Sequence, residues 1–332
     1  MDLLTHVLVA YLLTAGLVGL QPQYLAAGAL AGGLPDADAL FFPLARRFPI
    51  LRHHGITHSV FGVTVVAIAG GLLAPHILPG SPFVYFLVME VGGLAHILQD
   101  GFTQFSVPPL APFSDRPLQL DADRAINFLT LVVSAFGFYL LLGIERNQVA
   151  FQVYYLTLWA FAAFFIAYFG IRLAGRLAIG RQRRLLGEFQ QVVPTSNPFI
   201  WLLLSETNAG GRVRTTWARF ALGRGIIAGP FTAEGPLEPT PHDGLPASAK
   251  EALEWSYPLA RRASRVIETT YHFGEAFPEP AGGWVAVWYS LEFSAFGRSA
   301  GVRVRFPPAG APVEVKSTFY RPRQRAIYSG LT

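Results

Sequence analysis

Six apolar segments fill most of the first half of the chain. They lie at residues 3–20, 22–34, 58–79, 82–99, 125–143 and 149–174. A transmembrane helix needs about 20 mostly apolar residues, so the last four segments are long enough and the second is short. That second segment, QYLAAGALAGGL, places Gly28 and Gly32 four residues apart, a spacing that lets helix backbones approach closely. We therefore expect an α-helical polytopic membrane bundle of about six spans, with the second helix buried among the others.

The hydrophobic pattern changes near residue 185. Beyond it, alternating and aromatic-rich runs such as FIWLLLSET, RVRTTWARF, GWVAVWYSLEF and GVRVRF are separated by glycines and prolines, which is typical of antiparallel strands. The stretch SAKEALEWSYPLARRASRVI has a helical pattern, with a break expected near Pro258. We therefore predict a transmembrane helical domain at residues 1–184 and a soluble cytoplasmic α+β domain, rich in antiparallel strands, at residues 185–332.

Composition agrees with a membrane protein. Of the 332 residues, 52% are hydrophobic and 14% are charged, whereas a soluble domain has about 25% charged residues. The net charge of +5 is, in so apolar a chain, a signal of membrane topology, and we expect no nucleic-acid partner. The chain contains no cysteine, which excludes disulfides, thiolate metal sites and cysteine nucleophiles. Any metal ligand must therefore be His, Asp or Glu.

Arginines are concentrated in alternate loops between the apolar segments. They precede the third segment, separate the fourth from the fifth and follow the sixth: Arg46, Arg47, Arg52, Arg116, Arg124, Arg172, Arg176, Arg181, Arg183 and Arg184. Because positively charged loops stay in the cytoplasm, we expect both termini there. Residues 1–20 lack the basic start and the cleavage site of a secretory signal, so we interpret them as a retained helix. The chain is thus expected to be a multi-pass protein of the cytoplasmic (inner) membrane.

Polar side chains collect on the cytoplasmic side of this predicted bundle, although they come from five separate places in the chain. They are His6, Asp36, Asp38, His53, His54, His58, His96, Asp100, Asp115 and Arg116. Residues 96 and 100 share one helical face and can bind one ion together. Imidazoles and carboxylates suit Zn²⁺, with Mn²⁺ or Fe²⁺ as alternatives, and the ligands suffice for two or three ions. Singly, each residue would be an ordinary interfacial side chain or helix cap; their shared face predicts a metal site.

The same motifs resemble a known family. HHGITHS at 53–59, PDAD at 35–38 and HILQDGFTQFSVPPLAPFSDRPL at 96–118 resemble the YdjM-like family of membrane-bound proteins, commonly described as metal-dependent hydrolases, over residues 1–175. PTSNPFIW at 194–201 resembles an element of longer members with a soluble C-terminal domain. His54 stands where the family pattern usually has Arg, so a phosphate contact by that Arg would pass to His54 or to Arg52. The His-x-x-x-Asp element is also similar, more distantly, to zinc-dependent phospholipase C and P1 nuclease.

Together the cluster and the resemblance predict a membrane-embedded hydrolase that cleaves a phosphate ester of a lipid or lipid-linked substrate with a metal-activated water. The predicted metal ligands are His6, Asp36, Asp38, His53, His58, His96 and Asp100. The predicted catalytic residues are Arg52, His53, His54, Asp115 and Arg116, with an arginine stabilising charge on the phosphate oxygens. One alternative is a non-catalytic metal-binding scaffold or sensor whose soluble domain binds a partner protein. A transporter is a third reading, for which Glu90 and Asn127 supply too few polar residues within the spans.

Overall fold

A computed structural model describes residues 1–41, 55–104, 106–124, 126–146, 151–186, 189–236, 245–263, 273–280, 282–295, 298–308 and 313–320 of the chain. The chain divides into two compact units, residues 1–174 and residues 175–332. This division and the predicted domain boundary after residue 184 both fall within one long helix, α7 (Phe151–Leu186). A single continuous helix therefore belongs to both units.

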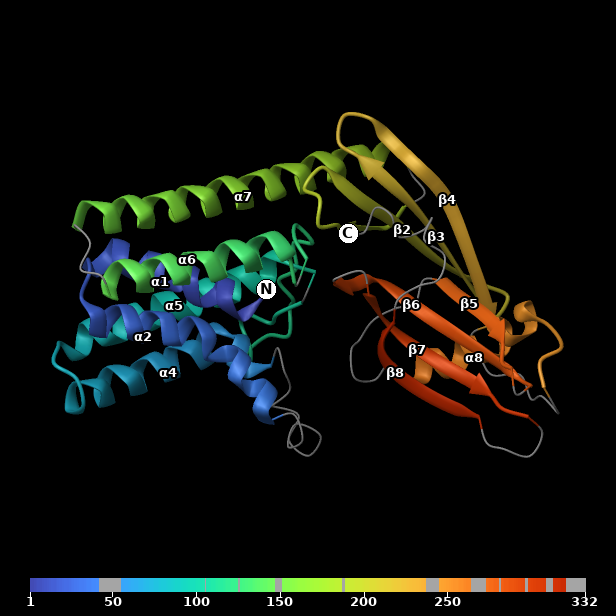
Figure 1. Cartoon of the computed structure of the whole chain (residues 1–332), viewed down its shortest axis with the longest axis horizontal. Coiled ribbons are helices and arrows are strands. Elements are labelled where there is room, and N and C mark those ends of the chain that lie inside the picture. Colours follow the sequence, from blue (N-terminus) through green and yellow to red (C-terminus); the bar gives the residue numbers. More distant parts are fainter. Residues whose placement is uncertain are drawn as a thin grey trace. The chain divides into compact units, whose positions relative to one another are not determined.

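The N-terminal unit is built from helices (Figure 1). Its α-helices are α1 (Leu3–Val18), α2 (Pro22–Gly33), α4 (Val60–Leu73), α5 (Pro82–Phe102), α6 (Phe128–Arg146) and the first part of α7. Short 3-10 helices lie at η1 (Pro35–Phe41), η3 (Ile56–His58) and η4 (Ala74–His76). Each of the six apolar segments thus contains one α-helix. Side chains placed just before them fix two of the starts, because Asp2 caps α1 and Ser59 caps α4.

The predicted number of spans is wrong. Within the described ranges, two helices are long and apolar enough to cross a membrane: α5, and α7 from Phe151 to Gln182. α4 shows why the others fall short, since it begins only after its Ser59 cap and gives way to η4 at Ala74. Its 14 residues extend about 21 Å at 1.5 Å per residue, less than the roughly 30 Å of a hydrocarbon core. Composition made these segments apolar, but caps and turns decided how long each helix became.

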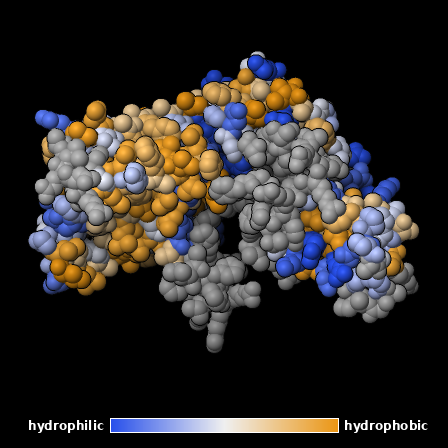
Figure 2. Space-filling view, viewed as in Figure 1, coloured by the Kyte–Doolittle hydropathy of each residue, from blue (hydrophilic) through white to orange (hydrophobic). Residues whose placement is uncertain are grey.

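Hydrophobic side chains nevertheless cover much of the visible face of the helical unit (Figure 2). Several lie on α1 and α4, where Leu17, Val65, Ile68 and Leu72 are each about half exposed or more. Soluble monomers rarely expose contiguous apolar patches of more than a few hundred Å². This surface is typical of helices that contact lipid.

α2 lies between α1 and α5, as the glycine spacing predicts. A Cβ atom on Gly28 would overlap the Thr14 side chain of α1, and one on Gly32 would overlap Ala10. On the other side, a Cβ atom on Gly92 of α5 would overlap the carbonyl oxygen of Gly28. Glycine is therefore required on both faces of α2, because no side chain fits between these backbones.

We expect Gly92→Ala to destabilise the helical unit by about 1–3 kcal/mol, the usual cost of overpacking. The new methyl group would meet a backbone oxygen, which cannot rotate away as a flexible side chain can. Thermal unfolding of the detergent-purified protein measures the effect. Gly16→Ala is the matched control, since a Cβ atom there meets nothing within 4 Å. Equal melting temperatures for Gly92→Ala and the native protein would contradict the close approach of α2 and α5.

The C-terminal unit contains two antiparallel four-stranded sheets and a helix (Figure 1). The first sheet has the order β1 (Gln191–Pro194), β2 (Ile200–Ala209), β3 (Arg212–Ala221), β4 (Gly225–Pro236). The second has the order β5 (Phe273–Pro278), β6 (Trp284–Ala295), β7 (Arg298–Phe306), β8 (Glu314–Tyr320). The predicted region rich in antiparallel strands is confirmed. The helix α8 (Ala249–Ala263) continues through Pro258, so the break expected there is absent.

The two sheets of this unit share one core. Leu202 of β2 and Trp217 of β3 pack in one cluster with Val285 and Val287 of β6. On the opposite face of the second sheet, α8 packs against β6 and β7. The end of α7 covers the opposite face of the first sheet, where Ile179 lies in one cluster with residues of β2 and β3. A helix followed by a four-stranded meander thus occurs twice, an arrangement that the sequence pattern did not reveal.

Candidate metal centre

Four side chains that are distant in sequence converge in the helical unit. Asp36 comes from η1, His58 from η3, and His96 and Asp100 from α5. Each offers one ligand-type atom, and these atoms all lie within 4.8 Å of one another. His58, His96 and Asp100 are buried, whereas the side chain of Asp36 is 23% exposed. We refer to these four residues as the metal centre.

α5 supplies two members of the centre from one face, because residues four apart lie on consecutive turns. Nε2 of His96 is 3.2 Å from Oδ2 of Asp100 and 3.7 Å from Oδ1 of Asp36. The other ring nitrogen, Nδ1, is 2.8 Å from the carbonyl oxygen of Gly32 and donates to it. In the neutral ring this bond places the proton on Nδ1 and leaves the lone pair on Nε2. His96 therefore presents a metal-binding lone pair to the two carboxylates.

His58 enters the centre from η3. Its Nε2 is 3.6 Å from Oδ1 of Asp36 and 3.5 Å from Oδ2 of Asp100. Its Nδ1 is 3.3 Å from Oδ2 of Asp38, and the Thr57 hydroxyl donates to that same carboxylate oxygen at 2.6 Å. A carboxylate behind the imidazole is the usual outer partner of a metal-binding histidine. Asp38, predicted as a direct ligand, thus lies where it orients His58.

His6 of α1 lies against the other oxygen of Asp100. Its Nε2 is 3.1 Å from Oδ1 of Asp100, and its ring stacks on that of His96 with 3.8 Å between centroids. The α-amino group of Met1 also contacts Oδ1 of Asp100. His6 is fully buried. The structure therefore brings this predicted ligand to the edge of the metal centre, beside the carboxylate that links it to the other three members.

The electrostatics of the centre favour a positive charge at its middle. Burial by itself would lower the pKa of His58, but hydrogen bonds with Asp36 and Asp38 and the charge of Asp100 raise it to about 9. Burial would likewise raise the pKa of Asp36, yet its hydrogen bond with His58 and the nearby imidazoles of His96 and His6 lower it. Three carboxylates thus compete for one cation, and a proton on His58 or a metal ion satisfies that demand.

The donors also suit a metal chemically. Ligand atoms held about 2.0–2.2 Å from a shared Zn²⁺ ion lie within about 4 Å of one another, and a modest contraction of the observed group meets that limit. Nε2 of His96 and both ring nitrogens of His6 have no hydrogen-bond partner among the described residues. Buried polar atoms are nearly always paired, so these nitrogens beside carboxylates are suited to a bound cation. Asp36, His58, His96 and Asp100 thus form a group that could hold a metal ion. Their roles as ligands and the identity of the metal stay predictions.

The remaining predicted residues do not join this group. Arg52, His53 and His54 lie outside the described residues. Asp115 and Arg116 are exposed on the loop after α5, and none of the contacts found in the described part of the chain connects either of them to the centre. The catalytic roles of all five stay predictions.

A second buried polar cluster was not expected from the sequence. Asp123 accepts hydrogen bonds from the Tyr168 hydroxyl at 2.6 Å and from Asn127 at 3.0 Å. Nη2 of Arg172 is 2.8 Å from Oδ1 of Asp123, and both side chains are fully buried. Asn127 also donates to the Tyr168 hydroxyl of α7 at 2.6 Å. Arg172, by contrast, is not a loop anchor but the internal partner of Asp123, a residue that stood out by no spacing or motif.

This second cluster is connected to the metal centre through the end of α5. Asp123 forms a backbone bridge with Thr103, which follows that helix. Both the amide nitrogen and the hydroxyl of Thr103 donate to the carbonyl oxygen of Asp100. The ion pair therefore ties α7 to the turn of α5 that carries a member of the metal centre.

Comparison with known protein families identifies the family of this chain. A family model described as YdjM inner membrane protein matches residues 1–178. Comparison with curated proteins and with solved structures gave no significant match, and the distant similarity to phospholipase C and P1 nuclease is not shown. The matched residues make up more than half of the chain and include the whole metal centre. The chain therefore belongs to the YdjM inner membrane protein family.

Proposed function

We propose that this protein is a membrane-embedded, metal-dependent hydrolase that cleaves a phosphate ester of a lipid or lipid-linked substrate. One observation carries the proposal. Because Nδ1 of His96 donates to Gly32, its Nε2 lone pair faces carboxylate oxygens at 3.2 and 3.7 Å. The lone pairs of this nitrogen and of the carboxylate oxygens repel each other when nothing lies between them. A divalent cation between them would be coordinated by all of them.

Asp36, His58, His96 and Asp100 would hold the ion, and Zn²⁺ is the ion we propose, with Mn²⁺ or Fe²⁺ as alternatives. His6, with both ring nitrogens unpaired among the described residues, would extend the site to a second ion. When bound, such ions supply Lewis acidity, lower the pKa of water and neutralise charge on phosphate oxygens. Asp38 and the Gly32 carbonyl would hold the two imidazoles in the correct tautomers.

Asp36 defines the direction of access. Its side chain is 23% exposed, whereas those of His58, His96 and Asp100 are exposed by 1% or less. Substrate and water would therefore approach past Asp36. Its lowered pKa keeps this carboxylate ionised, which suits a residue that holds a cation more than one that accepts a proton.

The surroundings of the centre support a lipid substrate. The centre lies within a unit that exposes many large hydrophobic side chains, so hydrocarbon tails could stay among them while the phosphate reaches the ions. The arginine-rich loops support an orientation with both termini and the centre on the cytoplasmic side. Arg52 and Arg116 remain the proposed partners of the charge that develops on phosphate.

Release of phosphate or headgroup from a panel of phospholipids and lipid phosphates tests the activity. The Zn²⁺-loaded protein in lipid nanodiscs should hydrolyse at least one class, lose the activity to a chelator and regain it with Zn²⁺. His96→Gln should be inactive while still entering the membrane fraction, because it lacks the lone pair aimed at the carboxylates. Stoichiometric metal binding without turnover of any class would contradict the hydrolase.

That last outcome would favour a second candidate, a metal-binding scaffold or sensor whose soluble unit binds a partner protein. Burial of three of the four members supports it, since structural metal sites are closed and catalytic ones keep an open position. The partial exposure of Asp36, which would let water and substrate reach the ion, supports the hydrolase over this second candidate.

A further inference from the structure

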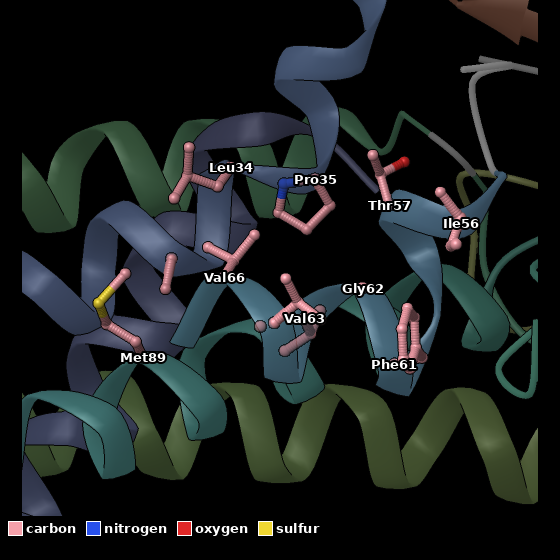
Figure 3. Close-up of a pocket in the computed structure, with 12 residues that line it drawn as sticks. Leu34, Pro35, Ile56, Thr57, Phe61, Gly62, Val63, Val66 and Met89 are labelled. Carbon is pink, nitrogen blue, oxygen red and sulfur yellow. The ribbon is translucent and has the colours of Figure 1, made fainter. Parts of the chain in front are cut away.

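An apolar cavity of about 300 Å³ lies among α2, η1, η3, α4 and α5 (Figure 3). Leu34, Ile56, Val63, Val66 and Met89 are among its walls. Thr57 is the one polar side chain among the described residues that line it. Ligand pockets typically have volumes of about 300 to 1,000 Å³, so the volume of this cavity is at the lower limit of that range. Its size and lining suit a single hydrocarbon chain.

The cavity adjoins the metal centre through two chain neighbours. Pro35 and Thr57 line the cavity, and each directly precedes a member of the centre, Asp36 or His58. The Thr57 hydroxyl donates to Asp38 and lies 3.1 Å from Nδ1 of His58. Figure 3 shows Thr57 at one end of the cavity and Met89 at the other. The cavity therefore extends from the residues that directly precede Asp36 and His58 to Met89 of α5.

We propose that this cavity binds the alkyl chain of the substrate while its phosphate lies at the metal centre. The inference rests on the proposed hydrolase and narrows its substrate to an amphiphile with one unbranched chain beside the phosphate. A peptide segment fits less well, because among the described lining side chains its backbone amides and carbonyls would find only the Thr57 hydroxyl as a partner. A hydrocarbon chain brings no polar groups that need one.

Chain length should then control binding of water-soluble alkyl phosphates. Each methylene that moves from water into the cavity raises affinity by up to about fourfold, and the gain stops when the cavity is full. Inside a bilayer the chain is already out of water. There the cavity would mainly position the phosphate and would add little affinity.

The test uses an octyl phosphonate with a diazirine at the end of its chain, a probe that cannot be hydrolysed. After illumination of the full-length, Zn²⁺-loaded protein in nanodiscs, peptide mapping should find the label near Val66 and Met89. Val66→Trp should fill the cavity and reduce this labelling at least tenfold. Ile68→Trp is the matched control, since Ile68 lies on the same helix with similar exposure, 48% against 42%, and does not line the cavity.

Bound zinc is measured in every variant to show that the centre is intact. If Val66→Trp does not retain zinc, Val65→Trp replaces it, because Val65 also lines the cavity. Labelling spread over the lipid-facing helices, or unchanged by an intact filling variant, overturns the cavity assignment even if short-chain phosphates are hydrolysed. Labelling in the cavity without hydrolysis of any alkyl phosphate upholds the cavity as an alkyl site and overturns the hydrolase instead.

Discussion

Asp100→Asn is expected to lose the bound metal. One oxygen of Asp100 lies beside His6, and the other lies between His58 and His96. The substitution keeps the size of the side chain but removes the charge that faces all three imidazoles. Elemental analysis of the detergent-purified protein should find at least one equivalent of zinc, manganese or iron in the native chain and a loss of most of it in the variant.

Two further variants distinguish direct ligands from outer partners by how much metal binding each one loses. His96→Gln should lose metal as Asp100→Asn does, because it removes a direct ligand. Asp38→Asn should keep the site but weaken its affinity by about 10–100-fold, as expected for an outer partner of a metal-binding histidine.

Asp121→Asn is the control for these variants, since that carboxylate bonds to Gln119 on the loop. Native metal content in both Asp100→Asn and His96→Gln would show that the centre does not bind the ion.

Arg172→Met is expected to destabilise the helical unit by about 3–5 kcal/mol, since it leaves the Asp123 carboxylate buried without its cation. Asp123→Asn/Arg172→Met should recover part of this loss, because neither member then carries an uncompensated charge. Denaturant unfolding in detergent measures the free energy of unfolding of each variant, and thermal unfolding measures the shift in its melting temperature. The control is Arg181→Met, an exposed arginine farther along α7, which should change stability by about 0.5 kcal/mol or less.

The same ion pair should also affect metal retention. It ties α7 to Thr103, whose amide and hydroxyl bond to the carbonyl oxygen of Asp100. Arg172→Met should therefore release metal at a lower temperature than Arg181→Met does. If Arg172→Met unfolds at the same temperature as the double variant, neutralising Asp123 recovers nothing, and the expected cost of an uncompensated buried carboxylate is contradicted.

The sequence by itself determined the local features of this protein. Each apolar segment became a helix, because a run of apolar residues buries its backbone polar groups by helix formation. Gly28 and Gly32 predicted a close helix contact because only glycine lacks the Cβ atom that would prevent it. The shared face of His96 and Asp100 followed from their spacing of four residues. Such features depend on neighbours within a few turns, and those neighbours are written in the sequence.

Tertiary structure alone decided which polar groups meet. Asp36 and Asp38 are two residues apart, yet one faces Nε2 of His58 and the other faces Nδ1. Their roles as ligand and outer partner depend on the direction of each side chain in a short 3-10 helix, and no spacing rule specifies that direction. The carbonyl group of Gly32 orients His96, but every residue has a backbone carbonyl, so the sequence could not single this one out.

The same holds at larger scale. The number of helices long enough to span a membrane depended on where caps and turns stopped them, as at Ser59 and Ala74 of α4. Arg172 resembles in sequence the other arginines that follow it, and only the packing of α7 placed it against Asp123. Long-range pairing is set by the backbone geometry of several helices at once. A local pattern therefore identified the residue types at the metal centre, and the fold chose which of them share it.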